Sequence, residues 1–183
     1  GGAAAAVWGV AGSARQPLAE SRPIGRSQRW QNPVGAADFD GDGKTEIASV
    51  VTPHLSGTLT LFRQLGRNLE PVASTSGYAN HCIGSTVLGM HAVADIDEDG
   101  IADIIIPSLN RRRLVAISFV GGQARGVQSV THDSPIGTAI VMAAIARTGV
   151  PELDYGLASA AGAVIGRWGR TRWARCAGRR SPR

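Results

Sequence analysis

The sequence has few of the residues that build most catalytic and transition-metal sites. Its two cysteines, Cys82 and Cys176, stand in unrelated contexts without metal-ligand spacing, and they neither require nor exclude a disulfide. The four histidines form no HExxH pattern, and no G-x-S-x-G nucleophile elbow occurs. The sequence therefore offers no catalytic residue, and we expect a chain that is not an enzyme.

Long apolar runs and aromatic residues are also scarce. No stretch approaches the roughly 18 apolar residues of a membrane-spanning helix, so we expect no membrane span. Aromatic residues make up 5% of the chain, whereas 24 glycines and 9 prolines predict frequent turns. This balance favours an all-β fold over long helices. Residues 1–12 resemble the end of a secretory h-region, although no basic n-region precedes them.

Acidic residues are missing from the end of the chain. From Arg167 onward there are seven arginines and no acid, whereas residues 1–166 carry 12 basic and 14 acidic groups. The net charge of +5 therefore belongs to residues 167–183, which we expect to be a disordered basic tail. An arm that binds nucleic acid or another acidic surface is the alternative for this tail. From the domain itself we expect no nucleic-acid binding.

What the sequence does contain is an acidic loop that occurs twice. ADFDGDGKTEIASV, residues 37–50, reappears 57 residues later as ADIDEDGIADIIIP, residues 94–107. The shared acids are Asp38, Asp40, Asp42 and Glu46, then Asp95, Asp97, Asp99 and Asp103. The first copy also contains the Gly-Lys-Thr that ends a nucleotide-binding P-loop. A phosphate site is excluded because the first glycine of that motif is replaced by Asp38 and further acids would repel the phosphate.

The pattern of acids predicts a calcium site in each loop. Acids at loop positions 1, 3 and 5 direct alternate oxygens toward one centre, position 7 supplies a backbone carbonyl from Lys44 or Ile101, and position 9 adds a carboxylate. This set approaches the 6 to 8 hard oxygen ligands that calcium accepts. Soft and imidazole ligands are absent, which argues against zinc or copper. An EF-hand is excluded because its twelfth position is Ser49 or Ile106 rather than glutamate.

The alternative for each loop is an Asp-Gly turn with solvated acids. Four acids within nine residues, repeated in register, favour a cation, because their mutual repulsion otherwise has no compensation. We therefore expect two bound calcium ions. Glu98 is at a non-ligand position and is expected to be exposed.

The acidic loops belong to a longer repeat. Two strand-like segments around a turn follow each loop, and a degenerate third copy has Ala144, Ala146 and Thr148 in place of the ligand acids but keeps Gly149 and Glu152. Repeats of about 50 residues with four short strands are typical of β-propeller blades. The approximate units are residues 1–53, 54–110 and 111–166. A solenoid or sandwich is the structural alternative.

The repeat makes further structural predictions. Three blades are too few to close a ring, so we expect a partial β-propeller from a larger protein. We expect strands at residues 46–51 and 103–107. Their residues Ile47, Val50, Ile104 and Ile106 should pack between blades or sheet layers.

These residues resemble FG-GAP or VCBS-type repeats, the blades of integrin alpha-subunit propellers and of many bacterial secreted and surface proteins. The resemblance rests on Asp38 to Glu46 and Asp95 to Asp103 and covers roughly residues 1–166. It implies that calcium stiffens the loop between two strands of a blade. Glu46 departs from the usual aspartate, and the third copy should carry no calcium.

The resemblance also implies a functional class. We expect an extracellular, periplasmic or cell-surface segment with a structural, adhesive or ligand-binding role. Its partners would be an unknown protein or glycan and the remaining blades of the same or another chain. The alternative is an accessory propeller of a secreted enzyme, for example one that acts on polysaccharide, with catalytic residues outside this chain. The Ala, Arg and Gly content suggests a bacterial gene.

Overall fold

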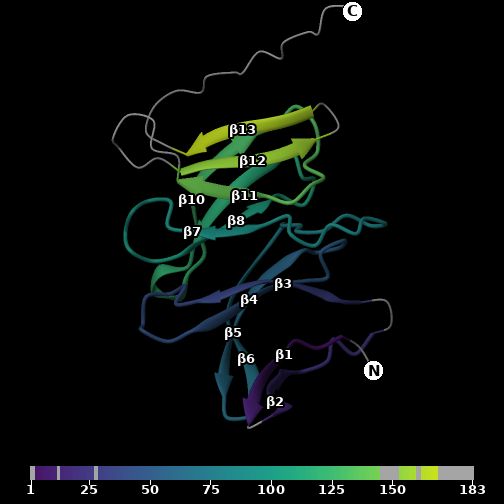
Figure 1. Cartoon of the computed structure of the whole chain (residues 1–183), viewed down its shortest axis with the longest axis vertical. Helices are drawn as coiled ribbons and strands as arrows, with labels where there is room; N and C mark the ends of the chain where they lie inside the picture. Colours follow the sequence, from purple (N-terminus) through teal and green to yellow (C-terminus); the bar gives the residue numbers. More distant parts are fainter. Residues whose placement is uncertain (1–2, 12, 27–28, 145–152, 160–161, 169–183) are drawn as a thin grey trace, which may run out of the picture.

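The computed structural model describes residues 3–11, 13–26, 29–144, 153–159 and 162–168, and within these the fold is almost entirely β. The one helical element among the described residues is a 3-10 turn, η1 (Val120–Gly122). Three sheets follow one another along the long axis of the molecule (Figure 1). The prediction of an all-β fold built as a partial propeller is confirmed.

The first sheet has six strands in the order β1-β2-β6-β5-β4-β3. Strands β3 to β6 form an antiparallel meander, and the hairpin of β1 and β2 joins its outer edge through a short parallel pairing of β2 with β6. The strands are β1 (Ala6–Ala11), β2 (Ala14–Ser21), β3 (Gln31–Ala37), β4 (Glu46–Val51), β5 (Thr58–Leu65) and β6 (Asn68–Ser76).

The second and third sheets repeat this meander. The second has the order β10-β9-β8-β7, with β7 (Ala92–Ala94), β8 (Asp103–Pro107), β9 (Arg113–Ser118) and β10 (Arg125–Thr131). The third has the order β11-β12-β13, with β11 (Val141–Ala144), β12 (Leu153–Ser159) and β13 (Gly162–Trp168). The short strand β7 lies near both β3 and β11. The first strands of the three meanders, β3, β7 and β11, therefore follow one another in space.

The strands predicted at residues 46–51 and 103–107 are confirmed as β4 and β8, whose bounds equal the predicted ranges. The meander β3 to β6 crosses residue 53, where the first sequence repeat was expected to end, so the limits of the repeats stay a prediction. Of the degenerate third loop, Ala146, Thr148, Gly149 and Glu152 lie outside the described residues, as does the basic tail from residue 169.

The main core lies between the first two sheets. Alternate residues of β4 and β5 meet alternate residues of β8 and β9, and the cluster consists of Phe39, Ala48, Val50, Leu59, Leu61, Ile104, Ile106, Val115, Ile117 and Phe119. Val50, Ile104 and Ile106 are fully buried there, as expected from the sequence. Ile47 is on the other face of β4 and packs, partly buried, against the cluster that contains Phe62.

Strand alternation also decides where the last acid of each loop points. Glu46 lies on the same face of β4 as Ala48 and Val50, which is the face buried against the second sheet. Asp103 lies on the same face of β8 as Ile105, which belongs to a second buried cluster. Both carboxylates therefore begin a strand with their side chains in the interior.

Candidate metal centre

Each acidic loop joins the first two strands of a four-stranded meander, β3–β6 or β7–β10. Loop 1, residues 38–45, connects β3 to β4, and loop 2, residues 95–102, connects β7 to β8. Both loops have left-handed backbone at the same two positions. At position 4, φ is 80° at Gly41 and 61° at Glu98, and at position 6 it is 83° at Gly43 and 85° at Gly100. Glu98 is exposed, as predicted, and is the one non-glycine residue among these four.

The acids at positions 1, 3 and 5 come together in both loops. One carboxylate oxygen from each of Asp38, Asp40 and Asp42 lies within 4.8 Å of the others, and the same holds for Asp95, Asp97 and Asp99. This convergence is what the alternating acids predict, because hard oxygen atoms around one point are the ligand type of calcium.

Glu46 and Asp103 lie under the triads and hold the loops onto the sheets. Glu46 is fully buried and accepts a hydrogen bond through Oε2 from the Phe39 N–H, at 3.1 Å. Asp103 is 1% exposed and accepts one through Oδ2 from the Ile96 N–H, at 2.9 Å. The bond joins matching residues in both loops, so the acid at position 9 has a structural role whether or not it also binds a cation.

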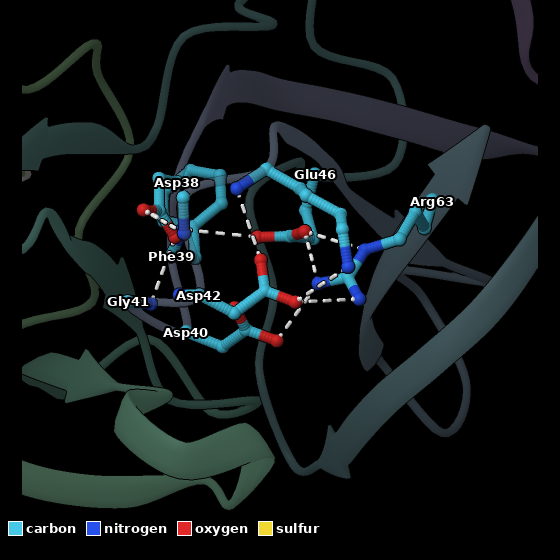
Figure 2. Close-up of polar contacts among 9 residues, drawn as sticks. Asp38, Phe39, Asp40, Gly41, Asp42, Glu46 and Arg63 are labelled. Carbon is cyan, nitrogen blue, oxygen red and sulfur yellow. Dashed lines mark hydrogen bonds and ion pairs between the residues drawn. The ribbon is translucent and has the colours of Figure 1, made fainter.

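Loop 1 contains a cation of its own, the guanidinium of Arg63 on β5 (Figure 2). Arg63 lies directly opposite Glu46 in the β4–β5 register and bonds to Glu46 Oε1 through Nε and Nη2. Its Nη2 is 2.9 Å from Asp40 Oδ2, and its Nη1 is 3.0 Å from Asp42 Oδ2. One partly buried arginine thus pairs with three of the four acids.

Backbone N–H groups bond to the remaining carboxylate oxygens of loop 1. Asp38 accepts from Gly41 at 2.8 Å and from Gly43 at 2.9 Å, one bond to each oxygen. Asp40 Oδ1 accepts from Asp42, and Asp42 Oδ1 accepts from Lys44. Every carboxylate oxygen of the four acids in loop 1 therefore has a hydrogen-bond donor.

Loop 2 has fewer donors for the same set of oxygens. Asp95 Oδ2 accepts from the Gly100 N–H at 2.9 Å, and Asp99 Oδ1 accepts from the Ile101 N–H at 2.9 Å. The nearby cation is Arg125, whose side chain is 62% exposed and touches only Asp97, at 3.4 Å. The other oxygen of Asp95, Oδ1, is buried without any hydrogen-bond partner.

One acid in each loop has a shifted pKa, and the two shifts have opposite directions. Burial raises the pKa of Asp103 to about 6; the Ile96 N–H opposes the rise, and the negative charges of Asp97, Asp99 and Asp95 add to it. For Asp42, desolvation raises the pKa, but the Lys44 N–H and the charges of Arg63 and Lys44 outweigh it, so the pKa lies below its usual value. The carboxylates of loop 2 lack the compensation that loop 1 has.

Lys44 and Ile101 occupy position 7, where a backbone carbonyl ligand was expected. Their N–H groups bond to the acid two residues earlier, and the Lys44 ammonium lies 3.4 Å from Asp42. The Ile101 side chain packs on loop 1, since a Cβ on Gly41 would lie 2.6 Å from its Cδ1. The two loops are therefore in contact. The metal roles of both carbonyls stay predictions.

Sequence reasoning missed Arg63. It lies 17 residues after Glu46, outside the repeated loop motif. Its contact follows from the β4–β5 register, which places a basic residue directly across from a buried glutamate and which the repeated motif does not specify.

The loop geometry and the four-stranded meanders agree with the comparison to protein families. Residues 38–106 match the FG-GAP-like repeat. The chain carries an FG-GAP-type repeat. The matched range begins at the first acid of loop 1 and includes both loops. Domains built from FG-GAP repeats are generally non-catalytic, and the repeat is typical of extracellular domains. No curated protein is similar enough to the chain to count as a match.

Among the residues that the structure describes, no helix has the length and hydropathy needed to cross a membrane.

Proposed function

We propose that the chain is a calcium-stiffened propeller segment of a secreted or cell-surface protein, in which the cation holds an FG-GAP loop closed so that the blade can serve a structural or adhesive role. The single observation that carries the proposal is the buried, unpartnered Oδ1 of Asp95 beside Asp97 and Asp99. A buried oxygen without a donor costs about 1–3 kcal/mol. A calcium ion bound by this triad would offset that cost.

The donor set of loop 2 fits calcium better than the alternatives. The gathered groups are carboxylates, the ligand type of calcium and magnesium, and no histidine or cysteine belongs to the cluster. Magnesium demands near-ideal octahedral geometry, whereas calcium tolerates a loop whose ligands come from successive residues. Asp95, Asp97 and Asp99 would hold the ion, and Asp103 and the carbonyl of Ile101 are proposed as further oxygen ligands.

Calcium would act on the fold through the connection between β7 and β8. The loop ends on β8, which is fully buried and carries Ile104 and Ile106 into the main core. An ion that fixes the loop therefore also fixes the start of a core strand. The proposed role of calcium is to stiffen the blade, and it requires no catalytic residue in this chain.

The experiment that tests the proposal is calorimetric titration of the EDTA-treated, folded chain with calcium, with magnesium as the control. The proposal expects saturable calcium binding and a weaker response to magnesium. A calcium heat trace that equals the dilution blank, together with an unchanged melting curve at millimolar calcium, would refute it.

A further inference from the structure

We infer that Arg63 is the resident cation of loop 1, so that calcium binds loop 2 alone although both loops have the same acidic motif. The inference rests on the proposed calcium function. It concerns which of the two loops is able to accept the ion, and it assigns to Arg63 the role of specificity-determining residue.

The geometry of loop 1 leaves little for calcium to gain. The guanidinium contacts Asp40, Asp42 and Glu46 at once, and backbone N–H groups satisfy the other carboxylate oxygens (Figure 2). Hydrogen bonds between a guanidinium and carboxylates are charge-assisted and are among the stronger ones in proteins. A calcium ion would have to replace these bonds rather than fill an unsatisfied position.

Displacing Arg63 would also be costly because the side chain is built into the sheet. It comes from β5, on the same face as the buried Leu59 and Leu61, and its side chain is 17% exposed. Glu46 beneath it is fully buried. If calcium took over the acids, the partly buried guanidinium would lose its three partners at the edge of the main core.

Loop 2 has no equivalent of Arg63. The β8–β9 register pairs Ile104 with Ile117, so the next residue, Ser118, stands across from Asp103 where Arg63 stands across from Glu46. Ser118 is buried, and its hydroxyl accepts a bond from the Val120 N–H. A serine carries no charge, and Arg125 reaches only Asp97 from an exposed position. The charge that Arg63 supplies in loop 1 is thus missing in loop 2.

A matched pair of substitutions at position 5 tests the inference. Asp99→Asn in loop 2 should weaken calcium binding by about tenfold or more, because it removes a ligand carboxylate and even the loss of an outer-shell partner costs roughly 10–100-fold. Asp42→Asn in loop 1 should leave calcium affinity and stoichiometry unchanged. Titration of the unsubstituted chain should give one calcium ion.

Substitution of Arg63 tests the cause directly. Arg63→Gln should raise the stoichiometry from one to two, and Arg63→Lys, which keeps the charge, should leave it at one. If Arg63→Gln does not fold in EDTA, folding restored by calcium but not by magnesium supports the inference, and no restoration counts against it.

The outcomes separate this inference from the proposed function. Two calcium ions in the unsubstituted chain, a loss of affinity in Asp42→Asn, or a count that stays at one in folded Arg63→Gln would each overturn the role of Arg63 while calcium binding stands. No calcium binding at all would overturn the proposed function itself.

Discussion

In loop 1 Arg63, from strand β5, contacts three acids, whereas in loop 2 the residue at the matching place is Ser118 and an arginine contacts only Asp97. Both loops have the same spacing of acids, the same left-handed turns and the same bond from a backbone N–H to the acid at position 9. The motif therefore builds the loop, and a residue outside the motif decides how its charge is balanced.

The largest effect is expected from removing the arginine. Arg63→Met in EDTA should destabilise the chain by about 3–5 kcal/mol, because it leaves the buried Glu46 and its neighbours without a counter-ion. Chemical denaturation monitored by circular dichroism would measure this.

The control for that substitution is Arg125→Met, which removes the exposed arginine beside loop 2. Exposed ion pairs contribute about 0–1 kcal/mol, so only a small change is expected. If the two variants lost similar stability, the contrast between a built-in and a loose arginine would be wrong.

The second prediction uses pH. The pKa of Asp103 is about 6 in the folded state and the usual 3.8 in the unfolded state. In EDTA the folded state therefore binds this proton at a higher pH than the unfolded state does, and the chain gains stability as the pH falls from above 6 to about 4. A shift of about two units corresponds to at most about 3 kcal/mol. Asp103→Asn should therefore be the more stable protein at pH 7, and this advantage should vanish near pH 4.

Only the difference between the two proteins is diagnostic in that experiment. Burial lowers the pKa of His54, His91 and His132, so these groups oppose folding as the pH falls below 6.5 in both proteins. Denaturation curves at several pH values would measure the difference. If the difference in unfolding free energy between the two proteins were the same at pH 7 and pH 4, the pKa of Asp103 would not be raised in the folded state.

The third prediction concerns calcium and stability. A ligand that binds only the folded state at a hundredfold excess over Kd adds about 2.7 kcal/mol, which raises Tm by roughly 5–10 °C. Asp97→Asn should lose most of this gain, and Asp40→Asn should keep it. Differential scanning calorimetry with and without calcium would measure both, and an equal loss in the two variants would remove the distinction between the loops.

The smallest effect is expected at the turn position where the loops differ. Glu98 has a φ of 61°, a left-handed conformation that costs a non-glycine residue about 1–2 kcal/mol. Glycine avoids this strain, but it lowers the stability by roughly 0.4–1 kcal/mol because it increases the conformational entropy of the unfolded chain. Glu98→Gly should therefore raise the stability by about 0.5 kcal/mol.

The matched change in loop 1 should have the opposite sign. Gly41→Ala should destabilise, since φ there is 80° and the new Cβ would lie 2.6 Å from Ile101 Cδ1. Both changes are measurable by thermal melting, and a stabilising Gly41→Ala would mean that the turn or the contact between the loops is described wrongly.

Much of the architecture could be predicted because it depends on residues that are close together in the sequence. Repeated acids and glycines fix the turns, and the β-branched runs after them form β4 and β8. The clustering of each triad follows from its spacing. Arg63 could not be read in this way, because its contact with Glu46 depends on strand register, which is a tertiary property. The buried state of Glu46 has the same origin, since it depends on which face of β4 meets the second sheet.

The most direct test of the central claim is a crystal structure of the chain grown with calcium, with anomalous scattering used to locate the ion. The account predicts one calcium peak, at about 2.3–2.6 Å from oxygens of Asp95, Asp97 and Asp99. In loop 1 it predicts no peak, with Arg63 still bonded to Asp40, Asp42 and Glu46. A calcium peak among Asp38, Asp40 and Asp42 with the guanidinium displaced would contradict it.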